Sequence, residues 1–303
     1  MTIAAPETYR LQRRATGIFA YTALDIIPVL AGVLHLAFVV VVIAGFAARA
    51  WSLNLALGVI YAISISWNIN GVSHNFIHTP YFTRRWMNYA FSLVESLAVG
   101  FSQSLYRWVH LRHHVGNSDR RDAAGNTIDE LSIYRHGQNG EPEYVWSFVL
   151  LSFFRDDPME TYRALKRKHP FDAKFGALEV ALFATFVLCA AIYDWRAVLF
   201  LVPFYYLGNA LSSLNGYYEH YNSNPDQPLA WGVSSYAPLY NVLWFNNGYH
   251  AEHHFRPSVH WTRLKALHAA ISDAQRDAGT HVIRTSHALG FLDPANQTLR
   301  MPA

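Results

Sequence analysis

Apolar residues run in four long stretches along the chain, separated by polar segments. A helix that crosses a bilayer needs about 20 mostly apolar residues, and we expect such spans at residues 26–46, 53–74, 175–193 and 198–218. The linkers "AARAWS" and "YDWRA" are short enough for tight turns within each pair of spans. The pattern predicts an all-α integral membrane protein with four transmembrane helices in two hairpins.

Basic residues are unevenly distributed around these spans. Lysine and arginine concentrate on the cytoplasmic side of a membrane. They gather before the first span, after the second and before the third, at Arg10, Arg13, Arg14, Arg84, Arg85, Arg163, Lys166, Arg167, Lys168 and Lys174. We therefore expect both termini to be cytoplasmic, with a cytoplasmic helical cap formed by residues 79–174 and 219–303. The whole chain, 1–303, is predicted to be a single domain.

Three further apolar segments are too short, too polar or too interrupted to span. They are "NYAFSLVESLAVGFSQSL" (88–105), "VWSFVLLSFF" (145–154) and "LAWGVSSYAPLYNVLWF" (229–245). We interpret all three as helices that lie at the membrane surface or pack on the bundle.

Composition supports a membrane protein and excludes some other classes. The chain is 52% hydrophobic and 15% charged, whereas soluble domains carry about 25% charged residues. A net charge of +3 gives no footprint for nucleic acid. The single cysteine, Cys189, excludes an intramolecular disulfide and a thiolate zinc cluster. The 16 histidines are the unusual feature.

Nine of these histidines occur in four short motifs near the predicted cytoplasmic face. The motifs are "SHNFIH", "WVHLRHHVGNSD", "YYEHYN" and "NGYHAEHHFRP". Spacings of three and four residues place side chains on one helix face, so each motif can turn its rings to one side. The nine are His74, His78, His110, His113, His114, His220, His250, His253 and His254.

Crowded histidines are explained best by metal ions. Protonated imidazoles repel one another, whereas neutral imidazole is a common metal ligand. Nine ligands exceed the needs of one ion, so the pattern predicts two ions with four or five imidazoles each. Imidazole suits zinc, copper, iron and nickel, and the residues alone do not choose among these metals.

The remaining histidines are expected to have structural roles or to lie in solvent. His35 lies in the first span and is expected to be packed or hydrogen-bonded. His260 and His268 belong to a predicted amphipathic helix, where only His260 has a chance of touching the site. The others lie in polar contexts and are expected to be solvated: His136, His169, His281 and His287.

Together, the paired hairpins and the motifs HxxxH, HxxHH and late HxxHH resemble the membrane fatty acid desaturase and hydroxylase superfamily. The resemblance covers about residues 26–267. "HHVGNSDRRD" and "HHFRP" are similar to the ends of the family's second and third histidine boxes. "NGYYEHYN" looks most like an extra motif of alkane hydroxylases, and acyl-CoA desaturases also have a histidine at that place.

The resemblance implies that all nine histidines are ligands of two iron ions. One iron would take His74, His78, His110, His114 and His254, and the other would take His113, His220, His250 and His253. Acyl-CoA desaturases place an asparagine four residues before the extra histidine, but here that position is Gly216, next to Asn215. Carboxylates can orient ligand imidazoles through the second ring nitrogen. The candidates for this role are Glu219, Glu252, Asp119 and Asp122.

The family's chemistry implies an enzyme that uses dioxygen to oxidise an unactivated C–H bond of a fatty acyl or lipid chain. Desaturation is the leading expectation. Hydroxylation of an alkane or acyl chain, acetylenation, ketolation and oxidative decarboxylation remain alternatives. The chain shows no motif for its own redox carrier, so a separate ferredoxin, rubredoxin-like or haem protein is expected to donate electrons. The competing class is a membrane metal-binding or haem-binding protein without enzymatic activity.

Overall fold

A computed structural model describes residues 11–115, 119, 127 and 129–297. The candidate carboxylate Asp122 lies outside the described residues. The chain divides into two compact units. Unit 1 comprises Met1–Arg13, His110–Ser152 and Ser213–Ala303, and unit 2 comprises Arg14–Val109 and Phe153–Ser212.

Unit 2 contains the long apolar helices. Its elements are α1 (Ile26–Ala44), α2 (Trp51–Asn68), α3 (His74–His78), α4 (Arg85–Val99) and α7 (Pro158–Lys168). A π-helical turn at Ile69–Ser73 joins α2 to α3. Three helices continue from one unit into the other: α5 (Gln103–His113), α6 (Val145–Arg155) and α8 (Pro170–His220).

In the described part of the chain, three helical stretches are long and apolar enough to cross a membrane. They are Ala23–Ala44, Trp51–His78 and Pro170–His220, with mean hydropathies of 2.8, 1.4 and 2.2. The third has 51 residues, which would make a straight helix about 75 Å long, more than twice the bilayer's hydrocarbon thickness.

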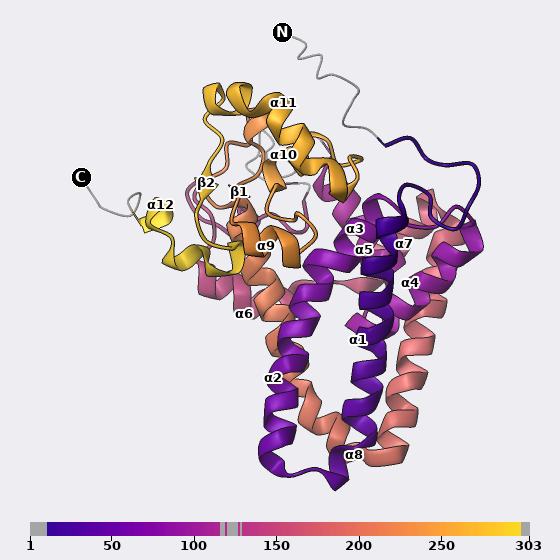
Figure 1. Cartoon of the computed structure of the whole chain (residues 1–303). Coiled ribbons are helices and arrows are strands. Elements are labelled where there is room, and N and C mark those ends of the chain that lie inside the picture. Colours follow the sequence, from indigo (N-terminus) through magenta and orange to yellow (C-terminus); the bar gives the residue numbers. More distant parts are fainter. Residues whose placement is uncertain (1–10, 116–118, 120–126, 128, 298–303) are drawn as a thin grey trace. The chain divides into compact units, whose positions relative to one another are not determined.

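The long element α8 is broken at one residue. Asp194 has non-helical angles, φ −153° and ψ 95°, and its carboxylate accepts the backbone N–H of Arg196 at 3.0 Å. Figure 1 shows the chain reversing direction within α8. The break falls in the "YDWRA" segment, where the sequence predicts a tight turn.

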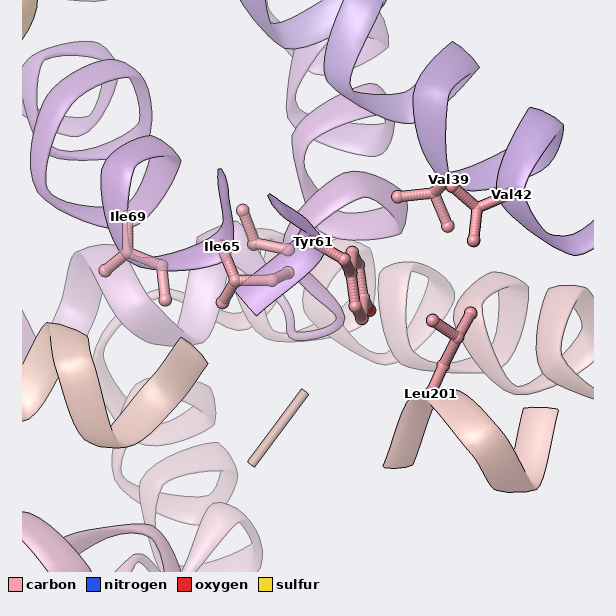
Figure 2. Packing of buried hydrophobic residues seen from close by; sticks show 7 residues of the cluster. Val39, Val42, Tyr61, Ile65, Ile69 and Leu201 are labelled. Carbon is pink, nitrogen blue, oxygen red and sulfur yellow. The ribbon is translucent and has the colours of Figure 1, made fainter. Parts of the chain in front are cut away.

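The core of unit 2 joins α1, α2, α4 and α8. Figure 2 shows the apolar cluster, which comprises Val39, Val42, Tyr61, Ile65, Ile69, Val99 and Leu201. A side chain at Gly208 of α8 would lie 2.7 Å from Cβ of Ile65, so this close approach of α2 and α8 requires glycine. Apolar side chains also point outward, and Leu34 is 66% exposed, as expected for a surface facing lipid.

Buried polar residues pin the helices of unit 2 together. The ring of His35 lies 3.0 Å from Oγ of Ser64 and 2.9 Å from the amide of Asn68, which confirms its predicted structural role. Glu179 accepts a hydrogen bond from the hydroxyl of Ser102 at 2.6 Å. These polar contacts lie inside an otherwise apolar bundle, where satisfied polar groups specify a single packing.

Unit 1 is built from short elements. They are α9 (Pro238–Leu243), α10 (His250–Phe255), α11 (Leu264–Asp277), α12 (Pro294–Gln297) and the strands β1 (Ser234–Ser235) and β2 (Val282–Ile283), which pair in parallel. Its apolar core includes Leu229, Tyr249, Val259, Leu264, Leu267 and Ile271. The predicted amphipathic helix that includes His268 is confirmed as α11, but it begins at Leu264, and His260 precedes it as the cap of a 3₁₀ turn.

For two of the three predicted surface helices, the predicted extent is wrong. Residues 88–105 form two helices, α4 and α5, because Gly100 adopts φ +83° and ends the first. The segment 229–245 is helical only in short turns, because Ser234 and Ser235 pair with β2 and Pro238 starts a new helix. The expected helix at 145–154 is confirmed as α6.

Candidate metal centre

The nine motif histidines fall into both units. His74 and His78 belong to unit 2, where they lie on α3 with ring centroids 5.2 Å apart. The other seven belong to unit 1. His110 and His113 lie on α5, and His114 directly follows the end of that helix. His220 is the last residue of α8, and His250, His253 and His254 lie on α10. Six of these seven are buried and His114 is half-buried.

Helix geometry turns the rings of unit 1 toward one another. On α10, His250 and His254 are one turn apart and share a face, whereas His253 points to the side of that face. The loop before α9 packs tightly on this helix, since a side chain at Gly232 would lie 2.9 Å from the ring of His250. Sequence spacing therefore becomes a compact cluster of imidazoles.

The ring nitrogens form two groups within unit 1. In the first, Nε2 of His220 lies 3.0 Å from Nε2 of His113 and 3.2 Å from Nε2 of His250. His254 belongs to this group, because its ligand nitrogen lies within 4.8 Å of those of His113 and His220. In the second, Nε2 of His114 lies 3.0 Å from that of His110 and 3.2 Å from that of His253.

This grouping corrects the partition expected from the resemblance. His253 lies with His110 and His114, and His254 lies with His113 and His220, so the two residues exchange places. The physical reason is the helical turn of α10. His254, four residues after His250, shares its face, and His253 is directed to the other group.

The distances are those of ligands around a common ion. Nitrogens bound to one ion at about 2.1 Å lie roughly 3.0 to 3.4 Å apart at angles of about 90 to 109°. Nε2 of His220 has two imidazole nitrogens within 3.2 Å. One proton can bridge only one such pair, whereas a metal ion binds all three lone pairs at once. The cluster therefore has the geometry and the chemistry of a metal site.

Buried aspartates lie against the outer nitrogens of two of these rings. Oδ2 of Asp129 forms a hydrogen bond of 2.7 Å with Nδ1 of His113, whereas Oδ2 of Asp119 lies 2.6 Å from Nδ1 of His220 without the alignment of a hydrogen bond. A carboxylate at Nδ1 keeps the proton there and leaves the lone pair on Nε2, which faces the cluster. Burial alone would lower the pKa of His113, but the charge of Asp129 outweighs it and the pKa is raised.

A second polar network lies beside His250. Oε1 of Glu219 accepts the amides of Asn247 at 2.6 Å and Asn215 at 2.7 Å, and it lies 3.7 Å from Nδ1 of His250. The predicted candidate Glu219 thus lies beside the cluster. Asn215, which stands next to the glycine that departs from the family pattern, holds this carboxylate.

The expectation that His287 is solvated is wrong. Its side chain is fully buried, with Nδ1 3.0 Å from the hydroxyl of Tyr240 and Nε2 2.9 Å from the carbonyl of Val233. Burial lowers the pKa of His287 to about 3, so the ring is neutral. The polar sequence around it gave no sign that the 3₁₀ turn at His287–Leu292 would fold inward.

Glu252, within the third box, bonds a different histidine. Its carboxylate accepts the hydroxyls of Ser234 at 2.7 Å and Tyr236 at 2.9 Å, and it lies 2.6 Å from Nδ1 of His268. None of these partners is among the nine motif histidines.

The other histidines have varied surroundings. His136 and His169 are exposed, as expected. His281 is half-buried and bonds Asn296 at 2.9 Å. His260 is buried and caps a 3₁₀ turn through the N–H of Thr262.

Sequence reasoning missed three residues near the cluster: Asp129, Asn247 and Tyr240. Asp129 stands 16 positions after His113, in a segment with no regular period. Asn247 lies three residues before His250 in a turn, and its polar character alone did not distinguish it. Each reaches the site through tertiary folding, which no local spacing signals.

The chain was compared with known proteins. A family model described as "Fatty acid desaturase" matches residues 49–286. Among curated proteins, the chain is 29% identical to "Sphingolipid delta(4)-desaturase DES1-like" of Oryza sativa subsp. japonica over 65% of its length. It is 26% identical to the protein of that name from Arabidopsis thaliana over 71% of the chain.

A third relative is "Sphingolipid delta(4)-desaturase" of Schizosaccharomyces pombe, which is 29% identical over 63% of the chain. The matches span 56%, 62% and 54% of the three relatives' own lengths. No solved structure gave a significant match.

Proposed function

Because the chain belongs to the fatty acid desaturase family, we propose that it is a membrane oxidoreductase that uses two iron ions and dioxygen to desaturate the acyl chain of a lipid. The observation that carries the proposal is the buried imidazole cluster of unit 1, in which one nitrogen of His220 lies within 3.2 Å of two others. An unactivated C–H bond is too weakly acidic to be broken by an acid or base group of the protein, so a redox metal suits the family's reaction.

The nine histidines would hold the two irons. One ion takes His113, His220, His250 and His254. The other takes His110, His114 and His253, and the family's first box adds His74 and His78. The nitrogen distances in unit 1 support the first set and three members of the second. The assignment of His74 and His78 rests on the resemblance.

When bound, the iron pair supplies the oxidising power, from dioxygen, to remove hydrogen from the substrate. The protein's own residues hold that pair in place. Asp129 fixes the tautomer of His113 through its hydrogen bond to Nδ1, so that Nε2 of this ring faces the metal, and the carboxylate of Asp119 lies beside Nδ1 of His220. Burial of these side chains, at 5% exposure or less, keeps bulk water away from the oxidant.

We propose four membrane crossings with both termini cytoplasmic. The break at Asp194 supports two crossings from α8, and the distribution of lysine and arginine supports the orientation. A reporter fused after Ala303 should read cytoplasmic, and one inserted between Arg49 and Ser52 should read external. A reporter at Gly140 that reads external would contradict the scheme.

For the substrate we propose a long saturated chain of a membrane lipid, with a sphingoid chain as the first to test, because the curated relatives are named as sphingolipid desaturases. A separate redox protein would deliver the electrons. Hydroxylation is the second candidate, because "NGYYEHYN" resembles the alkane hydroxylase motif. A hydroxylated lipid chain as the main product would favour hydroxylation.

Lipid analysis of a host cell tests the proposal. Expression of the chain in a host that lacks the activity should produce a new unsaturated lipid, detected by mass spectrometry. His113→Ala should abolish the product, because it removes a ligand. His136→Ala, at an exposed histidine, should leave it unchanged. Equal product with the His113→Ala variant would reject the metal site, and no oxidised lipid in any host lipid class would reject the activity.

A further inference from the structure

A pocket of about 270 Å³ lies in unit 1 beside α11. Six polar residues line it: Tyr236, His268, Ser272, Gln275, Arg276 and Thr280. None of them belongs to the histidine motifs. The volume is well above the roughly 15 Å³ that one water molecule needs on this measure, so the pocket can admit a small ligand group.

One face of α11 builds this pocket. His268, Ser272 and Gln275 are spaced by four and three residues, so they line up on one side of the helix. The neighbouring face, with Leu264, Leu267 and Ile271, packs into the apolar core. Polar side chains therefore occupy helix positions that border the core, where each needs a partner.

The lining offers hydrogen-bond donors. Gln275 is only 3% exposed, and in the described part of the chain its amide Nε2 has no hydrogen-bond partner. A buried donor without a partner is unfavourable, so a ligand that accepts a hydrogen bond from it would remove this cost. Arg276 brings a cation, and its ion pair within the described residues is an exposed contact with Asp273 at 3.2 Å.

Two hydroxyl donors of the lining are already engaged, and the amide oxygen Oε1 of Gln275 lies 3.4 Å from Nδ1 of His268. The hydroxyl of Tyr236 donates to Glu252, and that of Thr280 donates to the carbonyl of Leu229. Glu252 is fully buried, bonds Ser234, Tyr236 and His268, and is not one of the lining residues. The hydrogen bond to Glu252 raises the pKa of His268, which favours the form of the ring with two N–H donors.

We propose that this pocket binds an oxyanion, the phosphate or carboxylate group of a ligand, through the amide of Gln275, the hydroxyl of Ser272, the guanidinium of Arg276 and Nε2 of His268. The lining contains four donors, one of them a permanent cation, and no carboxylate. An oxyanion has several acceptor oxygens and matches this set. The proposal is independent of the oxidative function proposed above.

Calorimetry on the purified full chain in detergent, with inorganic phosphate as the probe, tests the site. The wild type should bind one phosphate saturably. Gln275→Met keeps the length of the side chain and removes the amide, so it should weaken binding about 10-fold or more. Gln297→Met, at an exposed glutamine of α12, is the matched control and should bind as the wild type does.

Thermal unfolding without phosphate separates binding from folding. Gln275→Met removes a buried donor that lacks a partner, so its unfolding temperature should equal or exceed that of the wild type. Ser272→Ala should also weaken phosphate binding without unfolding the protein. Absence of saturable binding to the wild type, or equal affinity in the wild type and Gln275→Met, would overturn the proposal.

A competition arm identifies the source of the oxyanion. If nanodiscs containing phosphatidic acid displace phosphate and nanodiscs of phosphatidylcholine alone do not, the site takes a lipid headgroup. If neither displaces phosphate, the site takes a soluble anion. Both results uphold the oxyanion site, provided that phosphate binding depends on Gln275.

Discussion

Replacement of Asp129 by asparagine should loosen the metal site without removing any of its proposed ligands. Oδ2 of Asp129 lies 2.7 Å from Nδ1 of His113, and Oδ1 accepts the backbone N–H of Leu131 at 2.9 Å. In the variant, the amide oxygen can keep the bond to Leu131. The amide NH2 then faces Nδ1 of His113 and moves the ring proton to Nε2, the nitrogen that faces the cluster.

The size of the effect follows from other metal sites. Loss of a residue that orients a ligand typically weakens metal affinity about 10- to 100-fold, which corresponds to about 1.4 to 2.8 kcal/mol. We expect Asp129→Asn to fall in this range. Protein stripped of metal would be titrated with Co²⁺ against a competing chelator, and absorbance of the bound ion would report occupancy.

A matched variant separates metal binding from stability. Asp293 is also fully buried in unit 1, but it bonds the backbone N–H groups of Arg284 and Thr285 instead of an imidazole. Asp293→Asn should lower stability and leave the affinity for Co²⁺ of the folded protein unchanged. If Asp129→Asn binds Co²⁺ within about twofold of the wild type, the orienting role of Asp129 is refuted.

Burial raises the pKa of Glu95 to about 8, far above that of an exposed glutamate. The free energy of unfolding should therefore fall as pH rises from about 4.5 to 8, because only the unfolded chain loses this proton in that range. Glu95→Gln should flatten this part of the profile, and an unchanged slope in thermal unfolding would contradict the prediction. His287→Ala should lower stability by about 1–3 kcal/mol, because the carbonyl of Val233 loses its imidazole partner and the hydroxyl of Tyr240 loses one of its partners. The exposed His136→Ala should have no effect in the same melt. Gly32→Ala should destabilise unit 2, because a Cβ there would lie 1.8 Å from Oε1 of Glu95; a melting temperature equal to that of the wild type would mean that this contact relaxes freely.

The sequence was informative where a local period or length decides the structure. The length of an apolar run identifies α1, α2 and the arms of α8, and the spacing of His110, His113 and His114 places them together. Gly100 shows the limit of such patterns, since its left-handed conformation splits one apolar run into two helices. Nothing in the local pattern distinguished that break from a tolerated glycine.

Tertiary contacts decided the rest. Asp129 meets His113, and His287 meets Tyr240, across separations of 16 and 47 residues, which no helix or strand period encodes. The exchange of His253 and His254 has a simpler cause. The spacing of four residues places His254 on the face of His250, and the rotation of α10 against α5 and the end of α8 decides which group of histidines each face meets.

The central claim is oxidation of a lipid chain by dioxygen at the iron pair, and isotope labelling tests it most directly. The iron-loaded protein would receive a saturated sphingoid or acyl lipid, an electron donor and ¹⁸O₂. Desaturation consumes one dioxygen, two electrons and two protons, and both oxygen atoms leave as water. We predict an unsaturated, unlabelled product that requires dioxygen and reductant and is absent with His113→Ala. A hydroxylated product carrying one ¹⁸O atom would contradict desaturation, and turnover without dioxygen would contradict the account as a whole.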